Sequence, residues 1–382
     1  MTHPSPPTWT PDTPGGVPPS SAPVRRGVRR RRPLRALLVA LVLVLVVLAA
    51  LLGAYGLLLA RTFDEHRATT DAGALQDPGD GPVNLLLLGS DSREGEDAAE
   101  AGQRSDTMML VHVPEDRHTV YVVSLLRDSY VDIPGHGDIP GHGAGKINSA
   151  LELGGYPLVV DTVEQLAGVP VHHVAELDFQ GFRGVTNALG GVEVCNPQAF
   201  SSGQVAPSYY PRGEVLLQDT AALRYVRERH AFGDGDVTRV ENQQRYVKGA
   251  LARFARPDVF LDPSRTTGVV SALAEHVAVD EGLTSGAVAS LLWQLRGVDR
   301  EDIEMFTVPT AGFETTDAGQ AVVRLDEGAM ADLRAALQAD DLESYLAEHG
   351  DGVAAADPAG AAPTPLLTAL AATGAEADPC DS

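Results

Sequence analysis

The sequence contains little positive charge and almost no lysine. Lysine and arginine together number 29 against 52 aspartates and glutamates, so the formal net charge is −23. A chain this acidic would bind the phosphate backbone of nucleic acid poorly, because that affinity comes from protein cations. Lys146 and Lys248 are the only lysines, so a lysine inside a motif is not background. The composition argues against a nucleic-acid-binding function.

Cysteine is equally scarce. Cys195 and Cys380 are the only two, and two cysteines this far apart are not a zinc-binding signature. In an exported protein they could form a disulfide that holds the C-terminal tail to the domain, since disulfides persist outside the cytoplasm. Two free or intermolecular thiols are the alternative, and a mass shift on reduction would separate the two.

Charge is missing altogether from one long stretch. Residues 36–60 contain no charged side chain, and seven arginines precede them within residues 1–35. At about 1.5 Å per residue the run is roughly 37 Å of helix, more than the ~30 Å hydrocarbon core of a bilayer. The alternative, a cleaved signal peptide, has a shorter apolar region. We expect a membrane helix over 34–60 with its N-terminus in the cytoplasm, and in either case an extracytoplasmic globular part.

Composition divides the rest of the chain. Residues 1–33 are rich in proline and arginine and are predicted to form a disordered basic cytoplasmic tail. Residues 61–82 are polar and are predicted to form a short stalk. We expect one extracytoplasmic domain over 83–345 and a flexible tail over 346–382.

Short apolar runs and runs with helical spacing alternate within this domain. The predicted strands lie at 83–89, 107–113, 119–125, 171–177, 192–194 and 302–309. The predicted helices lie at 156–168, 179–191, 219–226 and 284–297. Alternation of this kind predicts an α/β domain whose helices cover both faces of the sheet.

Five arginines gather within residues 223–245 of this acidic chain. The pattern predicts a helix capped by Asp219 and ending near Val226. Arg227 and Arg229 would then lie two apart in an extended segment, which points both side chains to one side.

A second helix is predicted after this segment, with Asp236 as its N-cap. Its buried stripe would consist of Val240, Val247, Leu251 and Phe254. Arg239 and Gln243 are four residues apart and share a face. Arg239 falls in the first turn, where free N–H groups and the helix dipole favour an anion, and a bound phosphate would explain a cation there. The alternative is a set of weak surface ion pairs with Glu228, Asp234 and Glu241.

Carboxylates and further cations follow the predicted strands. Asp91 comes after the first strand and Asp106 precedes the second, so the two could hold one hard divalent cation through oxygen ligands. The alternative is a turn-capping role for each. Arg127 and Asp128 follow the third strand, and Lys146 and Asn148 lie in a Gly-Lys-Ile-Asn sequence. An anionic substrate with Mg²⁺ would explain cations and paired carboxylates in one domain.

Six segments, taken in order, resemble the LytR-CpsA-Psr family of cell-wall glycopolymer ligases. They are "NLLLLGSDSR", "RSDTMMLVHV", "RDSYVDIP", "KINSA", "DFQGFRGVTNALGGVEV" and "ALRYVRER…GDVTRVENQQ". The match covers about residues 83–255, and the single N-terminal anchor agrees with it. No one segment would be specific, but their order and spacing are.

The resemblance implies a fold and an activity. The fold would be a three-layer α-β-α sandwich with a central mixed sheet, preceded by one transmembrane helix. The activity would be that of a phosphotransferase that moves an anionic glycopolymer, such as teichoic acid or arabinogalactan, from a polyprenyl-pyrophosphate carrier to peptidoglycan. The carrier's tail would lie in an apolar pocket between sheet and helices, and the protein would be a single-pass protein of the cell membrane in contact with its lipids.

The resemblance also assigns site residues. Asp91 and Asp106 would bind Mg²⁺, or Mn²⁺ in its place. The pyrophosphate would be held by Arg104, Arg127, Arg227, Arg229, Arg239 and Gln243. Supporting positions are Asp128, Lys146, Asn148 and Asp236. Asp91, if not engaged by the metal, is the candidate base.

The chain departs from the family at two motifs. Leu126 stands where the family usually has proline before Arg-Asp, and Asn242 stands where it often has arginine, so one cation is missing near the site. Two other functions remain open: a hydrolase that uses water on the same pyrophosphate, and a non-catalytic protein that binds the lipid pyrophosphate. An assay for polymer linked to peptidoglycan separates transfer from hydrolysis.

Overall fold

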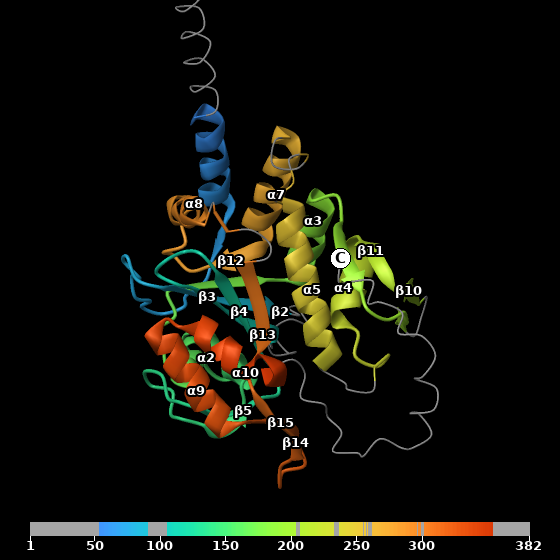
Figure 1. The fold of residues 1–382 in the computed structure, drawn as a ribbon. Helices are drawn as coiled ribbons and strands as arrows, with labels where there is room; N and C mark the ends of the chain where they lie inside the picture. The colour runs from blue at the N-terminus through green and yellow to red at the C-terminus, as the bar shows by residue number, and fades with distance from the viewer. Residues whose placement is uncertain are drawn as a thin grey trace, which may run out of the picture. The chain divides into compact units, whose positions relative to one another are not determined.

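The computed structural model describes most of residues 53–353, with gaps at 91–104, 204–206, 233–236, 255, 257, 259–261, 296 and 299–301. The chain forms two units, Met1–Tyr55 and Gly56–Ser382. The account below concerns the second unit, shown in Figure 1.

A seven-stranded mixed sheet forms the centre of this unit. The strand order is β1-β12-β7-β2-β3-β4-β13. The pairs β1–β12, β2–β7 and β4–β13 are parallel, and the others are antiparallel. The strands span Ala68–Thr69 (β1), Val277–Val279 (β12), His173–Leu177 (β7), Val83–Ser90 (β2), Ser105–Val113 (β3), Val120–Leu125 (β4) and Ile303–Thr307 (β13). The prediction of an α/β fold with a central mixed sheet is confirmed.

Strand β2 shows why the sheet has two apolar faces. Its side chains alternate between the faces because the strand period is two residues. Leu86 and Leu88 pack into the larger hydrophobic core on one face, whereas Leu87 and Gly89 line a cavity on the other. Both faces of the strand are therefore covered, as its nearly unbroken leucine run predicts.

Three helices cover the first face: α2 (Ser149–Ala167), α9 (Glu327–Ala339) and α10 (Leu342–Val353). Leu158, Val163 and Leu333 are among their buried contributions to the core. Helix α2 ends at Gly168, whose φ of 73° and backbone N–H bond to Glu164 form a left-handed cap. The opposite face is covered by α3 (Phe179–Ala188), α4 (Asp219–Arg227), α5 (Val237–Phe254) and α7 (Pro263–His276).

The helices of the second face have a core of their own. Two antiparallel strand pairs, β8 (Val192–Asn196) with β11 (Gly213–Leu217) and β9 (Phe200–Ser202) with β10 (Ser208–Tyr210), pack against them. Phe200, Tyr210 and Tyr225 form an aromatic cluster there, with ring centroids 4.8–5.4 Å apart. The remaining elements are β5 (Tyr130–Ile133), β6 (Gly143–Lys146), α8 (Ser285–Gln294), β14 (Thr310–Thr315) and β15 (Ala321–Leu325).

The folded part extends beyond the predicted bounds at both ends. Strand β1 falls in the predicted stalk but pairs with β12 in the sheet, and Ala72 is buried in the core. Helix α10 continues to Val353, past the predicted start of the tail. The stalk interpretation rested on polar composition, which does not reveal a two-residue strand.

Two local predictions around the arginine segment were wrong. Gln218, not Asp219, is the N-cap of α4, and Asp219 is already the first helical residue with a φ of 43°. Leu251 is 45% exposed rather than part of the buried stripe of α5, while Val240 is buried. The stripe is displaced because α5 packs against β8 and α4.

Among the residues that the structure describes, no helix combines the length and the apolarity needed to cross a bilayer. The predicted membrane helix over 34–60 lies largely outside those residues and stays a prediction.

Candidate active site

A cavity of about 590 Å³ lies between the second face of the sheet and helices α3, α4, α5 and α7. Apolar side chains from both layers line it. We call them the apolar wall: Leu87, Met109, Ala175, Phe182, Leu273 and Val277. A cavity of this size and chemistry suits a hydrocarbon chain.

Four arginines and one glutamine from three separate stretches of sequence line the same cavity. These residues are Arg127, Arg227, Arg229, Arg239 and Gln243. Each belongs to the predicted pyrophosphate site. The structure therefore brings together every member of that prediction whose side chain it describes.

Arg227 is the last residue of α4, and the backbone turns extended at Glu228, with a φ of −69° and a ψ of 132°. Arg227 and Arg229 both line the cavity, as their spacing of two predicts. The guanidinium carbon of Arg227 lies 4.2 Å from the centroid of the Phe179 ring. This cation–π contact fixes the direction of a long side chain that is otherwise exposed.

Glu228 holds the backbone between the two arginines. Its carboxylate accepts hydrogen bonds from the backbone N–H groups of Arg229, His230 and Ala231 at 2.7–3.1 Å. Burial acts to raise the pKa of Glu228, but hydrogen bonds from Ser202 and from these N–H groups outweigh it and lower the pKa. Glu228 is a positioning residue for the turn that carries the arginines.

Arg239 and Gln243 lie one turn apart on α5, and both are buried; Arg239 is 4% exposed. The Nε2 of Gln243 donates to the carbonyl of Val226 at 3.2 Å. Gln243 therefore also joins α5 to the end of α4. The predicted shared face of Arg239 and Gln243 is confirmed.

Arg127 and its neighbours form a polar cluster beyond the end of β4. Asp128 accepts from Lys146 at 2.8 Å and pairs with the Nε of Arg127 at 3.4 Å. The backbone N–H of Asn148 donates to the carbonyl of Arg127 at 3.2 Å. The predicted supporting residues Asp128, Lys146 and Asn148 thus contact Arg127 or one another.

Leu126, the departure from the family pattern, has a packing role. It is buried in a small apolar cluster with Val240 of α5 and Val323 of β15. That cluster joins the segment bearing Arg127 to the first turn of α5, which bears Arg239. Leucine at this position therefore helps to hold the two arginines in register.

The predicted metal ligands cannot be placed as fully. Asp91, Arg104 and Asp236 lie outside the described residues, and Asp106 belongs to β3 with only its backbone described. Ser90 pairs with Ser105, and Met108 pairs with Leu125. The backbone of Asp106 therefore lies at the rim of the sheet where β2 and β4 end, as does Arg127.

Metal binding and the pairing of the cysteines each involve a residue outside the described part of the chain, Asp91 and Cys380 respectively. Among the described residues, no three histidine, cysteine, aspartate or glutamate side chains are grouped to hold a metal. Two carboxylates are nonetheless the ligand chemistry that Mg²⁺ prefers. Cys195 is disulfide-bonded, and because Cys380 lies outside the described residues, the pairing of the two stays a prediction.

Cations outnumber carboxylates along the cavity. Its lining includes four arginines and two acidic residues, Glu176 and Asp178. Glu176 accepts a hydrogen bond from the hydroxyl of Tyr156, and Asp178 caps α3 through the N–H of Gly181 at 2.7 Å. Because both carboxylates are engaged in structural bonds, the field in the cavity favours an anion.

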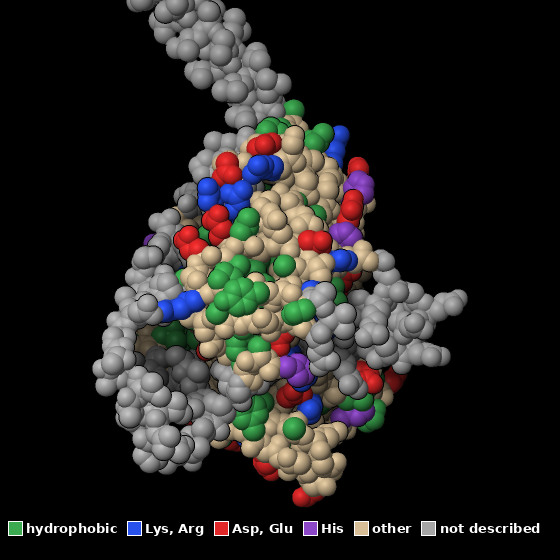
Figure 2. Space-filling model, turned by 90° about the vertical axis from the view of Figure 1, so that its right-hand side faces the viewer, with side chains coloured by type: hydrophobic (Ala, Val, Ile, Leu, Met, Phe, Trp, Pro, Cys, Tyr) green, Lys and Arg blue, Asp and Glu red, His purple; other side chains and the backbone are tan. Residues whose placement is uncertain are grey.

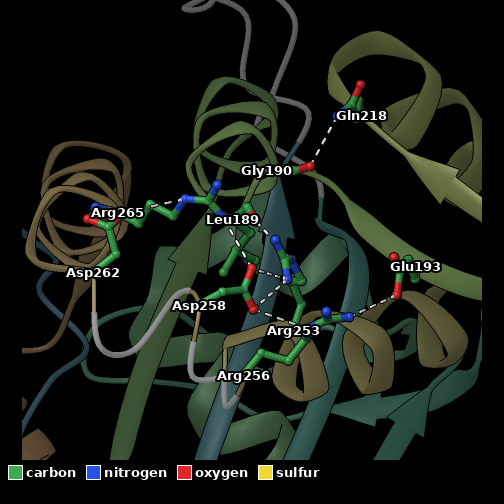
Figure 3. Close-up of polar contacts among 9 residues, drawn as sticks. All are labelled: Leu189, Gly190, Glu193, Gln218, Arg253, Arg256, Asp258, Asp262 and Arg265. Carbon is green, nitrogen blue, oxygen red and sulfur yellow. Dashed lines mark hydrogen bonds and ion pairs between the residues drawn. The ribbon is translucent and has the colours of Figure 1, made fainter.

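A second arginine cluster on the same side of the molecule is balanced instead (Figure 3). Asp258 accepts from Arg253, Arg256 and Arg265 at 2.9–3.3 Å. Arg253 also donates to the carbonyl of Leu189 at 3.0 Å. These contacts join the end of α5 to the start of α7. Because each of these arginines pairs with a carboxylate, they are structural. Figure 2 shows basic and acidic side chains interspersed on one face of the molecule.

The resemblance implied an apolar pocket between sheet and helices, but the sequence reasoning did not identify the residues of the apolar wall, Phe179 or the role of Glu228. Wall residues have the same strand and helix spacing as core residues, so the pattern alone could not mark them. A signal for Glu228 did exist: a carboxylate between two arginines, followed by a turn.

Comparison with known proteins identifies related chains. A model of the LytR_cpsA_psr family matches residues 59–339. The chain is 34% identical over 266 residues to the probable cell wall biosynthesis protein LcpB of Corynebacterium glutamicum. The match covers 65% of this chain and 59% of LcpB. The chain is 36% identical over 173 residues to the polyisoprenyl-teichoic acid–peptidoglycan teichoic acid transferase TagU of Enterococcus faecalis, covering 45% and 54%. The chain thus spans between half and three fifths of the length of these relatives.

Solved structures share the fold. TagV of B. subtilis superposes with a TM-score of 0.57 at 22% identity, over 68% of this chain and 97% of that one. The protein gbs0355 of Streptococcus agalactiae gives a TM-score of 0.59 at 20% identity, over 70% and 91%. At these identities the likeness concerns the fold alone.

Proposed function

Because the chain belongs to the LytR_cpsA_psr family, we propose that it transfers an anionic glycopolymer from a polyprenyl-pyrophosphate carrier to peptidoglycan. The observation that carries the proposal is a single cavity lined by both an apolar wall and four arginines. A polyprenyl pyrophosphate has two matching parts: a long hydrocarbon chain, which suits the apolar wall, and an anionic pyrophosphate, which suits the arginines. The name of the relative TagU, a polyisoprenyl-teichoic acid–peptidoglycan teichoic acid transferase, agrees with this substrate class, and the name of LcpB agrees with a role in cell wall biosynthesis.

The arginines would hold the pyrophosphate. Arginine suits this task because its planar fork meets phosphate oxygens in pairs. Two unit charges at ~4 Å attract by about 4 kcal/mol at an effective dielectric near 20. Several such contacts overcome the repulsion that an acidic protein otherwise exerts on a phosphate. The apolar wall would receive the part of the polyprenyl chain nearest the phosphates.

The reaction is a substitution at the phosphorus that bears the sugar. The oxygen of an acceptor hydroxyl forms the new P–O bond, and the bond to the bridging oxygen breaks. Polyprenyl phosphate leaves with that electron pair, and the hydroxyl proton passes to a base, for which the sequence offers Asp91 where the metal does not engage that carboxylate. Arg227, Arg229 and Arg239 stabilise the charge that gathers on the departing phosphate.

A divalent cation belongs to the same proposal. Asp91 and Asp106 would hold Mg²⁺, which when bound neutralises phosphate charge. Attachment to the cell membrane through residues 34–60, with the domain outside the cytoplasm, completes it. Contact with membrane lipids follows from that attachment.

Replacement of the paired arginines tests the proposal. We expect Arg227→Ala or Arg229→Ala to lower transfer at least ~100-fold, as does loss of one charge-stabilising donor in other enzymes. Thermal unfolding should stay near that of the parent. Arg256→Ala is the matched control, because Arg256 is a surface arginine paired with Asp258, and it should transfer normally.

The assay measures polymer joined to peptidoglycan and polymer released into solution separately. Full transfer by both variants would remove the proposed role of the pair. Release without joining would establish the hydrolase. Carrier binding with neither product would establish the non-catalytic protein.

A further inference from the structure

Helix α8 (Ser285–Gln294) has an exposed face without charge. None of its ten residues is charged. Gly286, Ala289, Ser290 and Trp293 are all exposed, and their spacing places them on one side of the helix. Trp293 is 68% exposed. The outer face of a helix in water normally carries charged side chains, and this chain has many.

The first turn of α8 is fixed to the helical residues 56–66. The carboxylate of Asp64 accepts from the backbone N–H of Ser285 at 2.9 Å and from its hydroxyl. These two bonds, the hydroxyl bond first, lower the pKa of Asp64. Arg67 donates to the carbonyl of Leu283 at 2.7 Å. The position of α8 is therefore set by the helix that follows the predicted membrane span.

The same helix marks the depth of the bilayer. Leu57 and Leu58 belong to the predicted span and are 65% and 52% exposed, as leucines that face lipid would be. Arg61 is the first charged residue after the run. Asp64 lies three residues further, about 4.5 Å along the helix axis. The headgroup layer is roughly 5–7 Å deep on each side of the hydrocarbon, so the predicted span would put Ser285, bonded to Asp64, at headgroup depth.

The orientation of α8 agrees with this depth. In Figure 1 α8 is seen nearly end-on, whereas the blue helix that contains residues 56–66 is seen from its side. Helix α8 thus runs across that helix instead of along it. A helix that crosses a membrane-attached segment in this way can lie along the bilayer surface.

We propose that α8 lies on the bilayer surface with Trp293 among the lipid headgroups. The proposal rests on the membrane attachment given under the proposed function. Tryptophan is enriched in this layer because its large ring is apolar at one end and polar at the other. The contact gives the domain one fixed orientation on the membrane that supplies its lipid-linked substrate.

Tryptophan fluorescence of the full chain in phospholipid vesicles tests this. Trp9 and Trp293 are the only tryptophans, so Trp9→Phe leaves Trp293 as the single reporter. We expect blue-shifted emission, weak quenching by iodide, and strong quenching by lipids brominated near the headgroup end of their acyl chains. Lipids brominated near the chain ends should quench less.

A tryptophan far from α8 provides the control. Phe313 of β14 is comparably exposed, and β14 lies at the opposite end of the unit from α8 (Figure 1). In a chain with Trp9→Phe, Trp293→Phe and Phe313→Trp, the reporter should be quenched by iodide and not by brominated lipid.

Each other outcome overturns the inference. Emission from Trp293 typical of water, with full iodide quenching, would place α8 away from the lipid. A blue shift that depends on protein concentration and not on brominated lipid would indicate a second copy or another protein as the occupant. Flotation of the vesicles is measured in parallel, so that a failure of membrane attachment is distinguished from a failure of α8 to dock.

Discussion

The two faces of the central sheet differ in how completely they are packed. On the first face Leu86, Leu110 and Val123 meet α2, α9 and α10 in a continuous core. On the second, Leu87, Met109 and Ala175 face a cavity of about 590 Å³. Both faces are apolar, so hydrophobicity does not decide which one stays open.

The difference lies in what else the covering helices touch. Helices α2, α9 and α10 contribute to one continuous core that they share with the sheet and with β5, and they settle onto the sheet. Helices α3, α4 and α5 pack against one another and against the antiparallel strand pair β8–β11 in a separate core. A second core of this kind can hold helices away from the sheet, because its aromatic packing resists the shift that closing the cavity requires. The open face is thus a product of the insertion of a second core.

Adjacent residues of β7 offer the strongest test of this comparison. Val174 is fully buried on the packed face, and Ala175 lines the cavity. Val174→Phe should destabilise the domain by about 3 kcal/mol, because an overpacked core must move its neighbours. Ala175→Phe should change the free energy of unfolding by less than ~1 kcal/mol, because its ring has empty volume to enter.

Carrier binding should respond in the opposite order. Ala175→Phe places a ring where we expect the polyprenyl chain, so binding of a polyprenyl pyrophosphate should fall severely although the fold is intact. Urea unfolding and lipid binding, measured on both variants, check the pair. Equal destabilisation would mean that the cavity closes in solution, and unchanged binding by Ala175→Phe would move the tail elsewhere.

Much of the packed face could be predicted from sequence. The leucine run of β2, the β3–β4 hairpin and the helical spacing that ends at Gly168 are local patterns with a direct physical meaning. The start of the fold could not be predicted from sequence, because β1 is two residues long and takes its place in the sheet only through pairing with β12. Pairing between residues more than 200 positions apart leaves no local pattern.

The charged residues of the site could be predicted from the sequence, whereas the residues that line its apolar wall could not. Arg227 and Arg229 share a side because of their spacing, and Arg239 was anomalous for a first helical turn. The apolar wall was hidden because a cavity and a core select the same side chains. The position of Asp219 was misjudged because a capping residue type one place along from Gln218 gives nearly the same pattern.

A smaller effect is expected where the open face is held by polar bonds. Glu228→Gln removes the charge that accepts three backbone N–H groups, and should destabilise the domain by about 1–2 kcal/mol at neutral pH. The pKa of Glu228 is lower in the fold than its usual value near 4.5. Its contribution is therefore complete above that value and is lost as the pH falls through the lowered pKa, since the unfolded chain takes up the proton first.

Unfolding of parent and variant at pH 7 and at successively lower pH measures this. The difference between them should be largest at pH 7 and should shrink below about pH 4.5. Glu241→Gln is the control, because Glu241 makes a surface pair with Arg245 at 3.0 Å and should cost no more than ~0.5 kcal/mol. A constant difference at every pH would show that shape, not charge, is what Glu228 contributes.

The smallest effect is expected at Tyr246, a cavity-lining residue that is neither an arginine nor part of the apolar wall. Thr186 donates its hydroxyl hydrogen to the carbonyl of Phe182, so in the 2.6 Å bond between Tyr246 and Thr186 the tyrosine is the donor. Tyr246→Phe removes that donor and leaves Thr186 bonded to Phe182, so it should lower the free energy of unfolding by no more than ~1 kcal/mol. Thr186→Val leaves the tyrosine hydroxyl without its acceptor and should lower it by about 1–3 kcal/mol.

Burial raises the pKa of Tyr246 to about 12, so this phenol is neutral at working pH and cannot be the base. Transfer by Tyr246→Phe should stay within a few-fold of the parent with an unchanged pH profile; a stable variant with a large loss of transfer would mean that the cavity wall takes part in the chemistry and not only in holding the lipid.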